Sequence, residues 1–217
     1  RYAGKHIKIE FQGGEISLRP DLIEAVESIV ENHCSSIELV ACSNLFEISE
    51  DFEKFFEKPN FFISTSLDGD VAATSYNRTR DIKKASKNLA NIKYVIEKYG
   101  QGKVSFLPTI TEHNFNRPSA LIDLYRTMGA SGIFLRPVNY MGFARKKHAE
   151  ASNEFTEWQD FFLKELEYIK QVNKECYFEE HYVADLVRRI FGGEKGAFID
   201  FRSPSNFLSD MAVIDFD

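Results

Sequence analysis

The segment HIKIEFQGGE, residues 6–15, joins a short apolar strand to a glycine-rich turn that ends in a carboxylate. His6–Phe11 has the pattern of a buried parallel strand, and ligands of parallel α/β folds bind at the carboxyl ends of such strands. Gly13 and Gly14 allow the backbone to approach a ligand closely, and Glu15 can pair with a ligand ammonium group. The alternative interpretation is a strand-to-helix turn with a solvated glutamate.

Outward from this segment, short apolar runs alternate with amphipathic helices. This alternation predicts an α/β fold with a parallel sheet, which either a doubly wound sheet or a barrel would satisfy. The expected strands are His6–Phe11, Ile37–Cys42, Phe61–Ser66, Val104–Ile110 and Ile133–Pro137. The expected helices between them are Pro20–His33, Ser49–Glu57, Ile82–Tyr99 and Pro118–Met128.

The pattern changes after Pro137, and we place a domain boundary near residue 150. Residues 1–150 would form the first region, and residues 151–217 a helical extension and the start of a C-terminal auxiliary region. The expected elements are a loop at Val138–His148, helices at Phe155–Asn173 and Tyr177–Phe191, and strands at Ala197–Phe201 and Met211–Phe216.

The composition of the 217 residues is that of a globular protein, with 43% hydrophobic and 28% charged residues. A formal net charge of -6 argues against general nucleic-acid binding. The sequence contains no apolar run long enough for a membrane span and no signal-peptide pattern. Its three cysteines show no disulfide pattern, which indicates a reducing, cytoplasmic location.

Polar residues also follow the carboxyl ends of other expected strands. Ser43 and Asn44 follow the second strand, and Arg136, near the end of the fifth, could pair with a carboxylate. Ser66 and Asp68 share one face after the third strand and could bind ribose hydroxyls. Each has a structural alternative, such as an Asx turn at Asp68. Their common edge of the sheet predicts one ligand pocket.

Other patterns that carry chemistry are weak. Arg78 could meet a carboxylate or a substrate, although a surface position is the alternative. The run Arg145–Lys147 is typical of a solvated face. Cys34 and Cys42 lack the spacing of a metal clip, and no HExxH, CxxC, GxSxG, P-loop or GxGxxG motif is present. We therefore predict no metal site in this chain.

Taken together, these segments resemble the radical S-adenosylmethionine (SAM) superfamily, and in particular its peptide- and protein-modifying maturases. FQGGE (11–15) is similar to the family's SAM-binding Gly-Gly-Glu motif, CSN (42–44) resembles its third-strand end, and ISTSLDG (63–69) its ribose-contacting strand. GIFLRPVNYMGFA (132–144) and FIDFRSPSNF (198–207) look most like maturases of the His-Xaa-Ser peptide system.

The resemblance implies a partial (β/α)6 barrel, of which this chain would supply strands two to six. The parent enzyme would cleave SAM to a 5′-deoxyadenosyl radical at a [4Fe–4S] cluster and modify a ribosomally synthesised peptide or protein. Gly13, Gly14 and Glu15 would hold the methionine amino group, and Ser66 and Asp68 would approach the ribose. The resemblance further implies cofactor contacts from Asn44 and Arg136 and substrate contacts from Gln12 and Arg78.

The sequence departs from the family pattern at several positions. The CxxxCxxC loop that holds the cluster is absent, so we expect a fragment whose cluster ligands precede Arg1. Ile16 and Asp70 stand where the family usually has proline. A cluster-less barrel that binds a peptide or nucleotide is the alternative function. An unrelated α/β hydrolase or synthase is a third, for which no nucleophile–base pair is visible.

Overall fold

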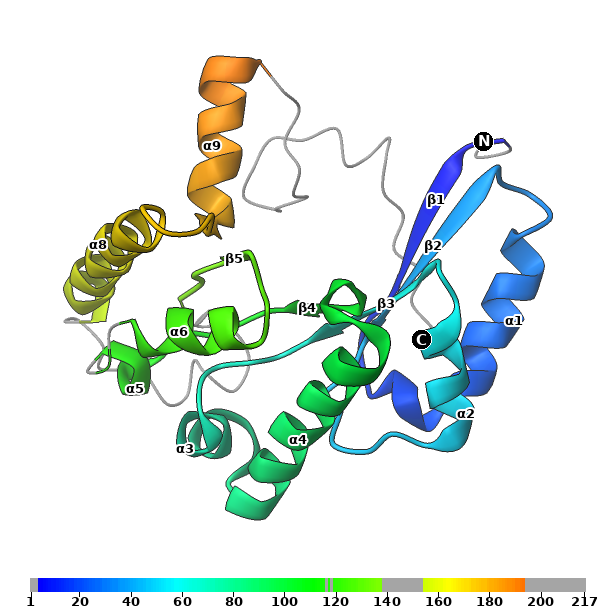
Figure 1. Ribbon diagram of the computed structural model, residues 1–217. Helices are drawn as coiled ribbons and strands as arrows, with labels where there is room; N and C mark the ends of the chain where they lie inside the picture. Colours follow the sequence, from blue (N-terminus) through cyan, green and yellow to red (C-terminus); the bar gives the residue numbers. More distant parts are fainter. Residues whose placement is uncertain (1–3, 116, 118, 138–153, 194–217) are drawn as a thin grey trace.

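The main sheet is parallel and wound in one direction. The computed structural model describes residues 4–115, 117, 119–137 and 154–193 (Figure 1). Its four strands lie in the order β1-β2-β3-β4, so neighbours in sequence are neighbours in the sheet. Doubly wound sheets reverse this order at a switch point, and the described sheet has none. The strands are β1 (His6–Phe11), β2 (Ser36–Cys42), β3 (Phe61–Thr65) and β4 (Val104–Phe106).

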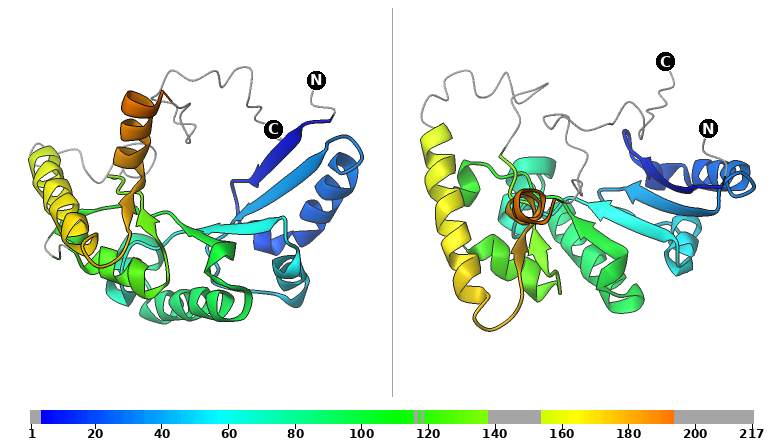
Figure 2. Two further views of the ribbon diagram at one scale, coloured as in Figure 1. Left: turned by 45° about the horizontal axis from the view of Figure 1, so that its top comes forward. Right: turned by 90° about the horizontal axis from the view of Figure 1, so that it is seen from above.

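Helices connect these strands along one face of the sheet (Figure 2). They are α1 (Pro20–Val30), α2 (Glu50–Glu53) and α4 (Ile82–Tyr99). The turns beside them are η1 (Ile16–Leu18), η2 (Lys54–Glu57), α3 (Val71–Thr74), the π-helical η3 (Ser75–Thr79) and η4 (Gln101–Lys103).

The expected helix Ile82–Tyr99 is confirmed as α4, and the residues that cap it explain where it begins and ends. The Asp81 side chain accepts the backbone N–H groups of Lys83 and Lys84 at 2.8 and 3.2 Å, which satisfies two donors of the first turn. Gly100 follows the last residue with a φ of 91°, a conformation that glycine adopts without strain.

The later part of the described chain is mainly helical. It contains α5 (Glu112–Phe115), α6 (Ala120–Thr127), α8 (Glu154–Val172) and α9 (His181–Gly192), with the short strands β5 (Gly132–Ile133) and β6 (Glu179–Glu180). The hydrophobic core around the sheet also includes Phe161, Ile169 and Phe178 from these later elements. No helix of the described part is long and apolar enough to cross a membrane.

Two expected strands differ in the structure. The fourth ends at Phe106 rather than Ile110, because Pro108 has no backbone N–H to extend the ladder. Residues Ile133–Pro137 do not extend the main sheet as a regular strand. Instead, β5 pairs in parallel with β6, and a single bridge between Ile110 and Pro137 joins the segments that follow β4 and β5.

The β5–β6 pair also corrects the expected helix Tyr177–Phe191, which begins only at His181. The buried Glu180 ends β6 and accepts the N–H groups of Leu135 and Val183 at 3.0 and 2.7 Å. Gly132 makes the close pairing possible, since a Cβ there would lie 2.8 Å from the Glu179 carbonyl oxygen.

The expected helix Ser49–Glu57 is also divided, into the α-helical α2 and the 3₁₀ turn η2. The loop Val138–His148 and the strands Ala197–Phe201 and Met211–Phe216 lie outside the described residues. The boundary expected near residue 150 does too.

Candidate functional site

The turn after β1 has open space around its glycines. Gly13 and Gly14 have φ angles of 84° and 58°, which favour glycine. A Cβ at either position would meet no atom within 4 Å. None of the residues that the structure describes therefore fills the space beside this turn, and among them the backbone stays open to a ligand.

Glu15 ties this turn to the end of the neighbouring strand. One carboxylate oxygen accepts the Asn44 backbone N–H at 2.9 Å, and the other accepts the N–H of Ser17 at 3.3 Å. The side chain is half-buried, so solvent or a ligand still reaches it. Each carboxylate oxygen has two lone pairs, so both retain capacity for a further donor such as an ammonium group.

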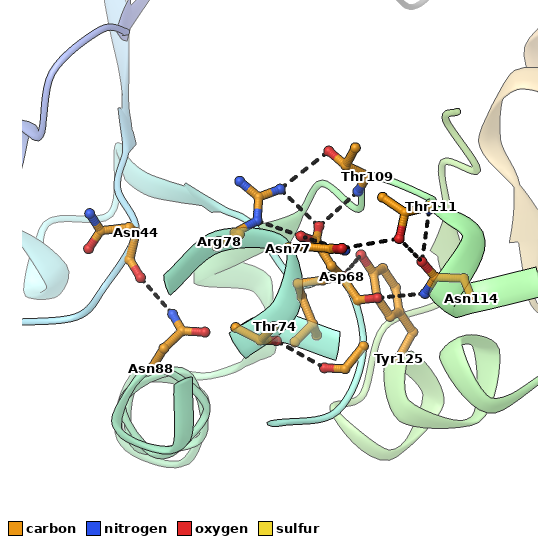
Figure 3. Close-up of polar contacts among 12 residues, drawn as sticks. Asn44, Asp68, Thr74, Asn77, Arg78, Asn88, Thr109, Thr111, Asn114 and Tyr125 are labelled. Carbon is orange, nitrogen blue, oxygen red and sulfur yellow. Dashed lines mark hydrogen bonds and ion pairs between the residues drawn. The ribbon is translucent and has the colours of Figure 1, made fainter. Parts of the chain in front are cut away.

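Asn44 is held from both sides. Its side-chain oxygen accepts the N–H of Phe46 at 2.9 Å, which closes an Asx turn. Its carbonyl oxygen accepts the Asn88 amide of α4 at 2.6 Å (Figure 3). The sequence-predicted residues Glu15 and Asn44 thus belong to one fixed group at the carboxyl ends of β1 and β2.

Asp68 forms the centre of a second group, after β3. Its carboxylate is fully buried and binds the Arg78 guanidinium through two hydrogen bonds of 2.6 and 2.8 Å (Figure 3). It also accepts the Thr109 backbone N–H at 2.8 Å, which links the end of β3 to the segment after β4. Bidentate guanidinium–carboxylate pairs are strong and directional. A ligand at the surface would meet Arg78, whose side chain is 32% exposed, before it met Asp68.

Residues that the sequence interpretation missed complete this second group. The Asn114 amide donates to the Asp68 carbonyl oxygen at 2.8 Å, and Thr111 donates to the Asn77 side-chain oxygen at 3.1 Å (Figure 3). Thr109 and Thr111 alternate with the apolar Ile110 after Pro108, a signal of the same kind as Ser66 and Asp68 around Leu67.

Tyr125 supports the second group from within the core. Burial, reinforced by the Asp68 carboxylate, raises the pKa of Tyr125 well above its usual value. The hydroxyl therefore stays protonated and donates to the Leu67 carbonyl oxygen at 2.9 Å. Nothing in the sequence distinguishes Tyr125 from the other apolar-face residues of its helix.

The remaining predicted residues have other contacts. Gln12 is exposed and donates to the Glu10 carboxylate at 2.7 Å. Ser66 is half-buried, one residue beyond the end of β3. The guanidinium of Arg136 lies over the Phe134 ring, 5.6 Å from its centroid. The structure thus joins Glu15 to Asn44 and Asp68 to Arg78.

The two positions at which proline was expected have structural roles. Ile16 is buried in the hydrophobic core as the first residue of η1. Asp70 caps α3 by accepting the Ala73 N–H at 3.0 Å and pairs with Arg117 at 2.5 Å. Burial works to raise the pKa of Asp70, but these two partners outweigh it and lower the pKa.

The cysteines do not fit an iron–sulfur cluster. Cys34 and Cys42 are half-buried and Cys176 is exposed, and all three are free. No group of three His, Cys, Asp or Glu residues in the described part could hold a metal ion. Because a [4Fe–4S] cluster is held by Cys thiolates, we derive no step through a cluster held by these residues.

Comparison with known proteins shows similarity at the level of structure. No family model matches the chain, and no curated protein matches it in sequence. The solved structure of anSMEcpe with bound AdoMet (SAM) and Kp18Cys peptide matches 90% of this chain, with a TM-score of 0.70 and 17% identity. Streptococcus suis SuiB bound to precursor peptide SuiA matches 81%, with a TM-score of 0.55 and 14% identity.

The chain spans 55% of the length of anSMEcpe and 38% of that of SuiB. At these identities the similarity concerns the fold. The chain shares with both proteins an α/β fold built from a parallel sheet and helices.

Proposed function

We propose that this chain is the SAM-binding part of a radical SAM enzyme that modifies a ribosomally synthesised peptide or protein. The observation that carries the proposal is the Glu15 carboxylate, fixed by two backbone N–H groups beside an open Gly-Gly turn. The shared fold supports it, since anSMEcpe was solved with AdoMet and a peptide, and SuiB with a precursor peptide.

In this proposal the groups centred on Glu15 and Asp68 contribute to binding different parts of SAM. Glu15 would accept the methionine ammonium group, while the open backbone of Gly13 and Gly14 would let the ligand approach. Ser66 and the backbone around it would approach the ribose. Asp68 is a positioning residue rather than a contact, because its buried carboxylate is occupied by Arg78 and Thr109.

The other proposed site residues are divided between the cofactor and the substrate. Asn44 would hold Glu15 in place through its backbone N–H, and Arg136 would supply a positive charge for the ligand carboxylate. Gln12 and Arg78 would face the substrate. SAM bound beside a reduced [4Fe–4S] cluster supplies a radical that abstracts hydrogen. We propose that the cluster ligands lie outside residues 1–217.

The proposal extends to the architecture. We propose that the one-directional sheet is part of a (β/α)6 barrel, with β1 to β4 as its second to fifth strands. The segment after β5 would continue it as the sixth, since Ile110 and Pro137 already form a parallel bridge. Residues 1–150 would form the barrel part and 151–217 an extension toward an auxiliary region, in a cytoplasmic protein.

Saturation-transfer difference NMR with millimolar SAM tests the proposal, because the method detects weak binding without a cluster. We expect adenine and methionine signals from the wild-type chain and none from Gly14→Ala, whose Cβ would occupy the ligand space. Gly193→Ala is the matched control, since Gly193 also has open space and a φ of 64°. Equal signals from both variants, or none from the wild type, would contradict the proposal.

One observation favours a second candidate function. Because the three cysteines do not form a cluster site, the chain would also suit a cluster-less barrel that binds a peptide or nucleotide. Sequencing the reading frame upstream of Arg1 separates the two. A CxxxCxxC loop there supports the enzyme, and an upstream frame without one supports the binding module.

A further inference from the structure

A cavity of about 410 Å³, largely open to solvent, lies beside α3 and η3, outside the groups centred on Glu15 and Asp68. Its lining residues include the apolar Ala73 and Ile82 and the basic or polar Arg80, His113 and Arg117. The volume is within the range of small-ligand sites. The cavity therefore has room for an amino-acid side chain.

Arg80 brings a positive charge to this cavity. It ends η3 with a φ of 56°, a left-handed conformation that is strained for a residue other than glycine. Its guanidinium lies over the Tyr76 ring, 4.9 Å from the centroid, and the His113 ring centroid is 3.5 Å from that of Tyr76. Arg78, two residues earlier, instead binds Asp68. The two arginines thus serve different sites.

The charge balance of the cavity suits one negative charge. Arg117 is already paired with Asp70, whereas Arg80 has no carboxylate within ion-pair distance among the residues that the structure describes. Of the two guanidinium groups that line the cavity, one is therefore compensated by a carboxylate and the other is not, among the residues whose side chains the structure describes. The whole chain has a formal net charge of -6, so the uncompensated guanidinium in this cavity is opposite in sign to the net charge of the chain.

We propose that this cavity binds a glutamate or aspartate side chain of an acidic peptide, which would be the substrate of the proposed enzyme. This assignment rests on the proposed function for the identity of the peptide. A side chain that ends in a carboxylate matches both the apolar lining residues Ala73 and Ile82 and the single uncompensated guanidinium of Arg80. A phosphate dianion would need more donors and more positive charge than Arg80 supplies.

The test is an NMR titration of the full chain with N-acetyl tetraglutamate amide, followed through the His113 imidazole signal. We expect a saturable shift that tetraglutamine amide does not produce. Arg80→Gln should weaken the binding about tenfold, which is the usual loss for a hydrogen bond to a charged group. Arg80→Lys should restore part of it. Lys87→Gln is the control, because it removes the same charge from an exposed position on α4.

Three outcomes would overturn the proposal: equal binding of tetraglutamate to wild type and Arg80→Gln, no His113 shift, or a shift produced by inorganic phosphate and not by tetraglutamate. The SAM experiment is independent of this site. Tetraglutamate binding without SAM binding would support the cavity assignment and contradict the proposed enzyme function. SAM binding without tetraglutamate binding would remove only the cavity assignment.

Discussion

The Glu15 carboxylate accepts the Asn44 backbone N–H at 2.9 Å, across 29 residues of sequence. This bond fixes the turn after β1 to the end of β2, where the strands are already paired through Phe11 and Ala41. Glu15 is therefore a structural link as well as a proposed ligand contact, and its two roles can be separated by substitution.

Replacing Glu15 with alanine should lower the free energy of unfolding by about 1–3 kcal/mol, because the N–H groups of Ser17 and Asn44 lose their acceptor. Glu15→Gln keeps one acceptor oxygen and should lose less stability, while SAM binding should be lost in both. Urea unfolding measures the first effect and NMR the second. Exposed Glu24→Ala should change the unfolding free energy by less than about 0.5 kcal/mol. Unchanged stability of Glu15→Ala would show that the bond contributes nothing.

Asp68→Asn should lower the free energy of unfolding by about 2–3 kcal/mol, since the Arg78 guanidinium loses its anionic partner. This loss of stability is smaller than that expected for breaking a wholly buried ion pair, because solvent reaches Arg78. The double variant with Arg78→Gln should lose less than the sum of the two single variants, as expected for residues in direct contact. Additive losses in urea unfolding would refute the coupling.

Glu165 should make stability depend on pH. Its side chain is buried, one oxygen accepts the Ser119 N–H at 2.5 Å, and the other has no hydrogen-bond partner among the described residues. Burial raises the pKa of Glu165 from 4.5 to about 7. Between these values the folded chain holds a proton that the unfolded chain has released. The free energy of unfolding should therefore fall as the pH rises from about 4.5 to 7, and level off above.

Glu165→Gln should remove this pH-dependent part, on the order of 3 kcal/mol, and make the chain more stable than wild type at pH 8. Thermal or urea unfolding at pH 5 and pH 8 measures the difference. Glu167→Gln, exposed on the same helix, should keep the wild-type slope. An unchanged slope in Glu165→Gln would assign the pH dependence to other groups.

Gly132→Ala should disrupt the pairing of β5 with β6. The new Cβ would lie 2.5 Å from the His181 ring and 2.8 Å from the Glu179 carbonyl oxygen, so the backbone has to shift. We expect a loss of about 1–3 kcal/mol in the free energy of unfolding and faster hydrogen exchange at Leu135, whose N–H binds Glu180. Gly102→Ala, with open space around it, should leave this exchange unchanged.

The sequence predicted those parts of the fold whose signals are local. The helix Ile82–Tyr99 has apolar residues at helical spacing and is followed directly by Gly100, so both signals lie in the helix or next to it. The strand His6–Phe11 was predicted with the same bounds for the same reason. In contrast, β6 consists of two glutamates, and only their packing against Gly132 makes them a strand.

The site was predicted only as a set of separate residues. Asp68 and Arg78 were expected to meet the cofactor and the substrate, yet they bind each other, because η3 returns the chain toward the end of β3. The sequence gives no spacing rule for such a pair. The role of Tyr125 could not be predicted for a similar reason, since its hydrogen bond to Leu67 joins residues that are 58 positions apart in the sequence.

The strand order β1-β2-β3-β4 has a consequence for synthesis on the ribosome. Each strand pairs with the one translated just before it, so every newly emerged strand finds its partner already available. Within this sheet, no pair of neighbouring strands has to admit a later strand between them. Because domains tend to fold from the N-terminus during translation, the sheet can grow one strand at a time in the direction of the growing chain.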